Sequence, residues 1–161
     1  MNGLYNHPKI KSMVSFTHGE GFGRPFLEFM ASGKPLVVPN WSGQIDFADS
    51  RYCTLLPGAL SKLHPSTVWD KVLIKDSEWF TTNYDYASKM LKDIFKTYKK
   101  YQEKSRGSYH YVKSTFSIDA MDKAFVKMIN KYMEQLPEQV DLKLPGTENK
   151  INIKLPKLKK V

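Results

Sequence analysis

Three short apolar runs constrain the fold of this chain more than any other feature. "SMVSFT" (12–17) and "KPLVVP" (34–39) are short and apolar, and glycine or proline lies close by, as is typical of buried strands. "RYCTLLP" (51–57) has the same character. Strands that alternate with helices form parallel sheets, so the pattern predicts an α/β fold with right-handed crossovers.

Helical segments are expected between these strands. The first should begin at Arg24-Pro25 and end at Gly33, because proline favours the first helical turn and glycine favours the C-terminal cap. "GQIDFAD" (43–49) should form a short helix before the third strand. Proline and glycine punctuate residues 57–79, which are expected to form an irregular surface excursion.

Two amphipathic helices are predicted near the C-terminus, over 84–104 and about 118–134. Gly107 and its polar neighbours should mark the break between them, and Ser117 or Asp119 should cap the second. The side chains expected in the core are Ala87, Met90, Leu91, Ile94, Phe95, Tyr98 and Tyr101 in the first helix and Met121, Phe125, Met128, Ile129 and Tyr132 in the second.

The C-terminal tail differs in composition from the rest of the chain. "LKLP" (142–145) recurs as "IKLP" (153–156), which is consistent with a hairpin or with an extended basic arm. We therefore expect two regions, an α/β domain over 1–135 and a basic extended tail over 136–161.

Composition limits the classes of protein to which this chain can belong. The 161 residues are 41% hydrophobic, as in a soluble domain, and no apolar run reaches the length of a membrane span. Cys53 is the only cysteine, so no disulfide can form within the chain and a reducing, cytoplasmic location is expected. Of the net charge of +9, residues 140–161 supply +4. A basic face with a lysine-rich tail is expected rather than a nucleic-acid site, since no nucleic-acid-binding motif accompanies the charge.

An acidic glycine turn, "HGEGFGRP" (18–25), follows the first strand at the carboxyl edge of the expected sheet, where ligands of α/β folds bind. Its glycines let a ligand approach the backbone, and the start of the following helix suits a diphosphate. The carboxylates of Glu20 and Glu28 accept hydrogen bonds from sugar hydroxyls, so one could hold a ribose and the other a hexose. A purely structural turn with a solvated Glu28 is the alternative.

"EGFGRPFLE" and the following "MASGKPLVVPNWSGQIDF" resemble a known signature. It belongs to glycosyltransferase family 4, in the donor-binding half of retaining GT-B enzymes. Its pattern runs E-G-F-G-x-P-x-x-E, then A-x-G-x-P-V-V, then a Gly-Gly-x-x-Glu turn. The resemblance extends loosely over residues 3–135 and implies a partial Rossmann-like parallel sheet flanked by helices, the C-terminal half of a GT-B enzyme.

The resemblance also implies roles for individual residues. Glu28 would hold the nucleotide ribose, and Glu20 would contact the hydroxyls of the donor sugar as the catalytic residue. The other donor-binding positions would be Gly21, Phe22 and Gly23 through their amides, Arg24 as a phosphate contact or a cap of the turn, and Ser42 and Gly43 in the second motif. That motif departs from the family at Ser42 and at Asp46, which replace glycine and glutamate. A nucleoside diphosphate sugar would be the substrate, with no cofactor and no metal.

Family members carry an acceptor domain and further donor-domain strands upstream of the acidic turn. Only 19 residues precede Glu20 here, so the chain is expected to be a fragment or truncated reading frame that is inactive alone. The first strand, "MVSFT", would then leave an exposed sheet edge, which predicts a homodimer or higher oligomer. The competing hypothesis is a non-catalytic binding or assembly module that keeps the glycosyltransferase fold. Nucleic-acid binding ranks third.

Overall fold

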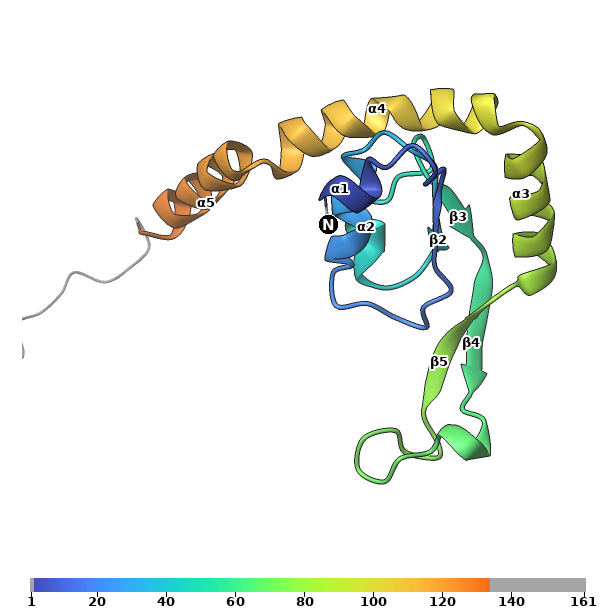
Figure 1. Ribbon diagram of the computed structural model, residues 1–161. Helices are drawn as coiled ribbons and strands as arrows, with labels where there is room; N and C mark the ends of the chain where they lie inside the picture. Colours follow the sequence, from blue (N-terminus) through green and yellow to red (C-terminus); the bar gives the residue numbers. More distant parts are fainter. Residues whose placement is uncertain (1, 134–161) are drawn as a thin grey trace, which may run out of the picture. The chain divides into compact units, whose positions relative to one another are not determined.

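The computed structural model describes residues 2–133 and has a mixed α/β fold (Figure 1). These residues divide into a compact unit up to Ala124 and a second unit from Phe125 onward. The elements in chain order, with η for a 3-10 helix, are α1 (Asn2–Tyr5), β1 (Met13–Val14), α2 (Arg24–Met30), β2 (Leu36–Pro39), η1 (Gly43–Asp46), β3 (Thr54–Leu56), β4 (Gly58–Lys62), η2 (Pro65–Thr67), β5 (Glu78–Thr82), α3 (Tyr84–Lys96), α4 (Tyr98–Phe116) and α5 (Ile118–Met133).

The predicted parallel sheet is confirmed. The strand order is β1-β2-β3, and both neighbouring pairs are parallel, with Val14 opposite Val37 and Val38 opposite Leu55. Each strand lies within the run that predicted it, and α2 begins at Arg24 as expected. Gly33 adopts a left-handed conformation (φ 66°) just beyond α2, where an L side chain would be strained.

Helices pack on both faces of the sheet because successive residues of β2 point to opposite sides. Leu36 and Val38 join one buried cluster, which also contains Phe26, Phe29 and Met30 of α2. Val37 joins a second cluster on the other face. The remaining buried members of that second cluster are Leu56 of β3, Ala87 and Ile94 of α3 and Tyr101 of α4.

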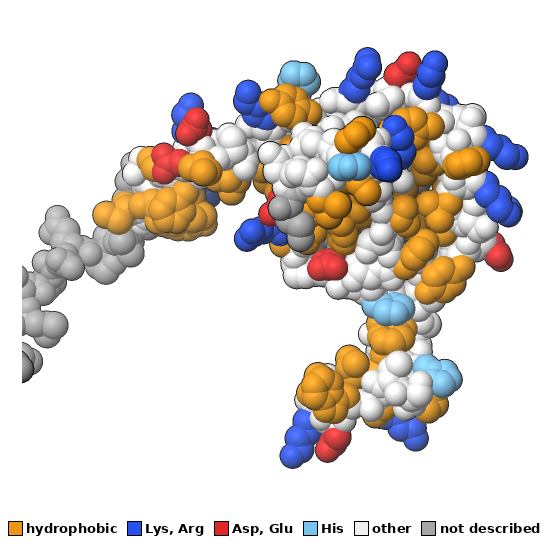
Figure 2. Space-filling model, in the orientation of Figure 1, with side chains coloured by type: hydrophobic (Ala, Val, Ile, Leu, Met, Phe, Trp, Pro, Cys, Tyr) orange, Lys and Arg blue, Asp and Glu red, His pale blue; other side chains and the backbone are white. Residues whose placement is uncertain are grey.

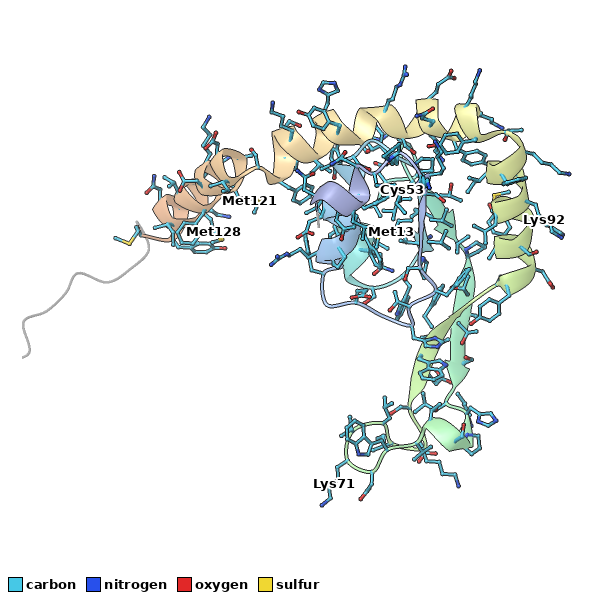
Figure 3. The ribbon with its side chains drawn as sticks, viewed as in Figure 1. Met13, Cys53, Lys71, Lys92, Met121 and Met128 are labelled. Atoms are coloured by element: carbon cyan, nitrogen blue, oxygen red, sulfur yellow. The ribbon has the colours of Figure 1, made fainter. Side chains whose placement is uncertain are left out.

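The prediction of an irregular excursion over 57–79 is correct only in part. β4 and β5 pair antiparallel from Gly58 opposite Thr82 to Lys62 opposite Glu78 and form a two-stranded ribbon, whereas residues 63–77 between the strands are mostly irregular (Figure 1). At the far end of the ribbon lie η2 and a short bridge between Trp69 and Leu73. Lys71 marks that end in Figure 3.

The predicted helix over 84–104 is two helices, and its break was misplaced. α3 ends at Lys96 and is capped by Thr97, whose hydroxyl donates to the carbonyl of Asp93 over 2.8 Å, and α4 then runs on through Gly107 to Phe116. Gly107 has a packing role instead, since a Cβ there would lie 2.6 Å from the ring of Tyr52. Phe95 was expected in the core but is 89% exposed.

α5 matches the predicted last helix, and the amide of Ala120 donates to the hydroxyl of Ser117, which confirms Ser117 as its cap. The apolar face expected to be buried is exposed within the described residues, as the exposed fraction of Phe125 (58%) shows. No helix in residues 2–133 is long and apolar enough to cross a membrane. The predicted tail (136–161) and its two short motifs lie outside the described residues.

Candidate functional site

The predicted site residues lie at the carboxyl ends of neighbouring parallel strands. The loop after β1 carries Glu20 and the glycines that follow it, and the loop after β2 carries Ser42 and Gly43. Since β1 and β2 run in the same direction, both loops leave the sheet at the same edge. This is the edge at which the sequence places a ligand site.

A set of hydrogen bonds fastens the two loops together at Glu20. The amide of Glu20 donates to the hydroxyl oxygen of Ser42 over 3.1 Å, and the same hydroxyl donates to the carbonyl of Glu20 over 2.7 Å. The amide of Gly43 donates to that carbonyl as well, over 3.0 Å. The backbone of Glu20 is therefore held on both its donor and its acceptor side.

Gly43 must be glycine for this arrangement to form. A Cβ at position 43 would lie 2.2 Å from the carbonyl oxygen of Gly21 and 2.8 Å from the Cα of Phe22. These obstacles are backbone atoms, which cannot rotate away as the end of a side chain can. A Cβ on Gly21, in contrast, would have no neighbour within 4 Å.

Ser42 occupies a backbone conformation that glycine normally supplies, with φ 67° and ψ −161°. The resembled motif has glycine at this position, so the conformation agrees with the pattern although the residue does not. The hydroxyl of Ser42 compensates for the strain by making the two bonds to Glu20 that a glycine would lack. A departure from the motif therefore has a structural explanation.

The loop then turns into α2 at Gly23, which has φ 85° and whose carbonyl accepts from the amides of Phe26 and Leu27. Phe22 packs its ring against Phe47, with ring centroids 5.0 Å apart. The side chain of Phe22 is thus a packing group, and only its backbone is free for the role predicted for it.

The amides that follow Glu20 in this loop are candidates for ligand binding. Among residues 2–133, the N–H groups of Gly21, Phe22 and Gly23 have no hydrogen-bond acceptor, and Gly21 and Phe22 are exposed whereas Gly23 is buried. Consecutive free amides in a turn form a typical concave binding site for an anion. α2 has only seven residues, so these loop amides, rather than a long helix dipole, are the feature that suits a phosphate.

Glu28 lies one turn into α2 and is held differently from Glu20. Its carboxylate accepts from Nε of Arg24 over 2.9 Å, an ion pair between residues four apart on one helix. The side chain of Arg24 is 83% exposed and that of Glu28 is 38% exposed. No hydrogen bond or ion pair in the described part of the chain links Glu28 to Glu20.

The β4–β5 ribbon also contacts the site loops, which the sequence did not predict. The imidazole of His18 stacks on Trp79 of β5 with ring centroids 3.9 Å apart and planes 1° from parallel. Its Nδ1 donates to the carbonyl of Phe80 over 2.6 Å. On the next loop, Trp41 stacks on the ring of Phe80, with centroids 5.5 Å apart. The sequence feature that could have indicated this contact is the pair Trp79 and Phe80, which lies in a run of β-forming residues.

Other reactive groups of the described residues offer little to a site. Burial raises the pKa of the Cys53 thiol to about 12, so it is an unreactive core side chain (Figure 3). No group of three or more His, Cys, Asp and Glu side chains within residues 2–133 is arranged to hold a metal ion.

No known protein family, no curated protein and no solved structure matches this chain. The assignments drawn from the motif thus depend on residues 20–46 and on the geometry of the two loops.

Proposed function

We propose that this chain is the donor-binding part of a retaining hexosyltransferase that uses a nucleoside diphosphate sugar. The observation that carries the proposal is the exposed amides of Gly21 and Phe22, which have no acceptor in residues 2–133 and directly follow Glu20, whose backbone is bonded to Ser42. A turn with free amides, beside a glutamate whose backbone is held by hydrogen bonds, offers groups for both halves of such a donor, the diphosphate and the sugar. The three-stranded parallel sheet would be part of a Rossmann-like GT-B domain.

In this proposal the two carboxylates divide the donor between them. Glu28 accepts hydrogen bonds from the ribose hydroxyls, and Glu20 contacts the hydroxyls of the transferred hexose. The loop amides bind the diphosphate, whose negative charge grows as the sugar leaves. Electrostatic stabilisation of this kind needs donors that are already oriented, and the bonds from Ser42 and Gly43 to Glu20 supply that order.

Arg24 has a defined place in the site. It forms an ion pair with Glu28, so a ribose must either displace it or share the carboxylate with it. A guanidinium released from Glu28 could turn to the diphosphate, since Arg binds phosphate through several donors at once. We assign Arg24 to phosphate binding in the liganded state.

The proposal is tested by titrating the purified chain with UDP, GDP and ADP and their common sugar conjugates in a calorimeter. We expect one nucleotide to bind with sub-millimolar affinity, which would also identify the base. Glu28→Ala should abolish this binding, whereas Glu103→Ala, which removes an exposed carboxylate from α4, should leave it unchanged.

Two results would contradict the proposal. If no nucleotide binds while circular dichroism shows a folded chain, the residues do not form a donor site and the chain is a non-catalytic assembly module. If a nucleotide binds equally well to the Glu28→Ala variant, the site lies elsewhere.

A further inference from the structure

The open edge of the parallel sheet is the surface on which this inference rests. Met13 and Ser15 donate their amides to Pro35 and Val37, so these two residues face β2. Backbone groups alternate in direction along a strand, so the N–H and C=O groups of Ser12, Val14 and Phe16 face away from β2. No strand in residues 2–133 lies on that side, because β1 is at the end of the strand order.

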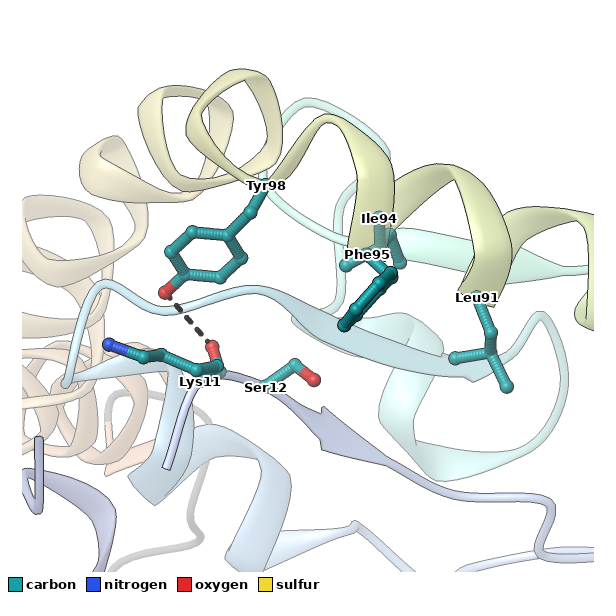
Figure 4. Close-up of a pocket in the computed structure, with 6 residues that line it drawn as sticks. All are labelled: Lys11, Ser12, Leu91, Ile94, Phe95 and Tyr98. Atoms are coloured by element: carbon teal, nitrogen blue, oxygen red, sulfur yellow. Dashed lines mark hydrogen bonds between the residues drawn. The ribbon is translucent and has the colours of Figure 1, made fainter. Parts of the chain in front are cut away.

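An apolar groove accompanies this edge on one face of the sheet. It has a volume of about 360 Å³ and lies between the start of β1 and the end of α3 (Figure 4). The residues that line it are Lys11, Ser12, Leu91, Ile94, Phe95 and Tyr98. Phe95 is 89% exposed, and Val14, which points to the same face as the buried Val37, is 37% exposed.

Figure 2 shows hydrophobic side chains reaching the surface on the side of the compact unit where α3 lies, with Lys or Arg side chains projecting around them. Phe16 continues this apolar surface along β1, since it is 39% exposed and its ring contacts Tyr84 of α3 at a centroid distance of 5.8 Å. An unpaired strand edge next to exposed aromatic side chains is a template for pairing with another strand.

We infer that two copies of this chain associate through β1, edge to edge and antiparallel, about a twofold axis at Val14. This pairing would join two three-stranded sheets into one continuous sheet. The inference is independent of nucleotide-sugar binding, because it uses the lateral edge of the sheet and not the loops at its carboxyl end.

The register follows from the residues that face outward. With Val14 opposite Val14 of the second copy, Ser12 lies opposite Phe16. Each outward-facing residue is therefore opposite another outward-facing residue, and such a pair can exchange both of its backbone hydrogen bonds. Antiparallel registers that are shifted along the strand leave some of these groups unpaired. The twofold axis also brings the two α3 helices to the same face of the joined sheet, where each could cover the exposed Phe95 of the other.

The charges near the strand are compatible with this arrangement. Lys11 lies before β1 and Glu20 lies after it. Antiparallel pairing about Val14 places Lys11 opposite Thr17 of the second copy, in the direction of its Glu20, so lysine does not face lysine across the axis. Like charges directly opposite each other would destabilise the pair.

A designed disulfide tests the register directly. Directly opposed residues of an antiparallel hydrogen-bonded pair have Cα atoms about 5.5 Å apart, within the range that a disulfide can bridge. Val14→Cys should therefore form a covalent dimer under mild air oxidation, visible on a non-reducing gel. Val72→Cys is the matched control, because Val72 is also exposed (60%) but lies on the ribbon, and it should stay monomeric. Cys53 is buried and should not interfere.

Sedimentation equilibrium at tens of micromolar tests the association itself. The unmodified chain should have twice the mass of 18.6 kDa, and Val14→Lys, which places two like charges on the axis, should reduce the mass to that of one chain. Phe95→Ser should weaken the dimer without affecting folding, since its side chain is exposed. A monomeric unmodified chain, or cross-linking of Val72→Cys as fast as Val14→Cys, would overturn the inference.

Discussion

Glu20 and Glu28 are both predicted to bind the donor, yet the protein holds them in different ways. Glu20 is fixed through its backbone, which donates one hydrogen bond to the loop after β2 and accepts two from it, and by the close approach of Gly43 to Gly21 and Phe22. Glu28 is fixed through its side chain, by one exposed ion pair to Arg24 within its own helix.

Because of this difference, a substitution near Glu20 should affect both stability and binding, whereas a substitution near Glu28 should affect mainly binding. The contacts at Glu20 join two loops that are about twenty residues apart in sequence, so loss of these contacts affects the fold as well as the site. An exposed ion pair between residues four apart contributes only about 0.3–0.5 kcal/mol to stability. Substitutions on the Glu20 side should therefore change stability strongly, and those on the Glu28 side should change it little.

The largest effect is expected for Gly43→Ala. Its Cβ would meet the backbone of Gly21, so the two loops must move apart, at a cost of about 2–4 kcal/mol in unfolding free energy. Urea denaturation followed by circular dichroism measures this value. Gly21→Ala is the control, because its Cβ has open space, and it should change stability by less than about 1 kcal/mol. Equal values for the two variants would mean that the loops are not in contact.

Two substitutions at Ser42 distinguish the effect of its hydrogen bonds to Glu20 from the effect of its strained backbone conformation. Ser42→Ala keeps the strained conformation and loses both bonds to Glu20, so it should lower the unfolding free energy by about 1–3 kcal/mol. Ser42→Gly loses the same bonds but relieves strain of about 1–3 kcal/mol, and the two terms roughly cancel. Thermal denaturation of the pair measures the difference. If glycine proved no better than alanine, φ at this position would not be strained.

The smallest effect is expected for Arg24→Ala. Because the ion pair is exposed, the unfolding free energy should fall by no more than about 0.5 kcal/mol, and 1 M salt should remove most of the difference from the unmodified protein. A double-mutant cycle with Glu28→Ala isolates the pair. A coupling energy well above 1 kcal/mol would show that Glu28 is as firmly fixed as Glu20, and the contrast between them would disappear.

The sequence predicted the elements with clear boundaries and strong periodicity. Gly33 and Pro35 mark the α2–β2 connection, Pro39 is the last residue of β2, and the apolar runs around Val14, Val37 and Leu55 match the three strands. The ribbon was missed because β4, "GALSK", contains one large apolar residue, Leu60, and so shows no alternation. Its strand character comes from pairing with β5, which is a long-range contact.

Gly107 explains why the predicted break between the helices was misplaced. Taken from the local sequence alone, Gly107 indicates a helix end. It lies inside α4 instead, where the ring of Tyr52 occupies the space that a side chain at this position would need. Thr97, where the helices separate, carries little sequence signal of a break. The candidate site shows the same contrast between local and long-range information. The turn at Glu20 could be predicted from the local sequence, whereas its contacts with Ser42 and Gly43 depend on the fold.

The stacking of His18 on Trp79 has a consequence for experiments on the acidic loop. His18 belongs to this loop, whereas Trp79 lies on the ribbon, so the separation of their rings reports whether the loop has moved. Indole fluorescence is sensitive to a stacked imidazole. The chain has three tryptophans, and with Trp41 and Trp69 replaced by Phe, the emission of Trp79 alone would follow the opening of the loop in real time. The protein therefore carries an intrinsic optical probe of its own candidate site, with no need for an attached dye.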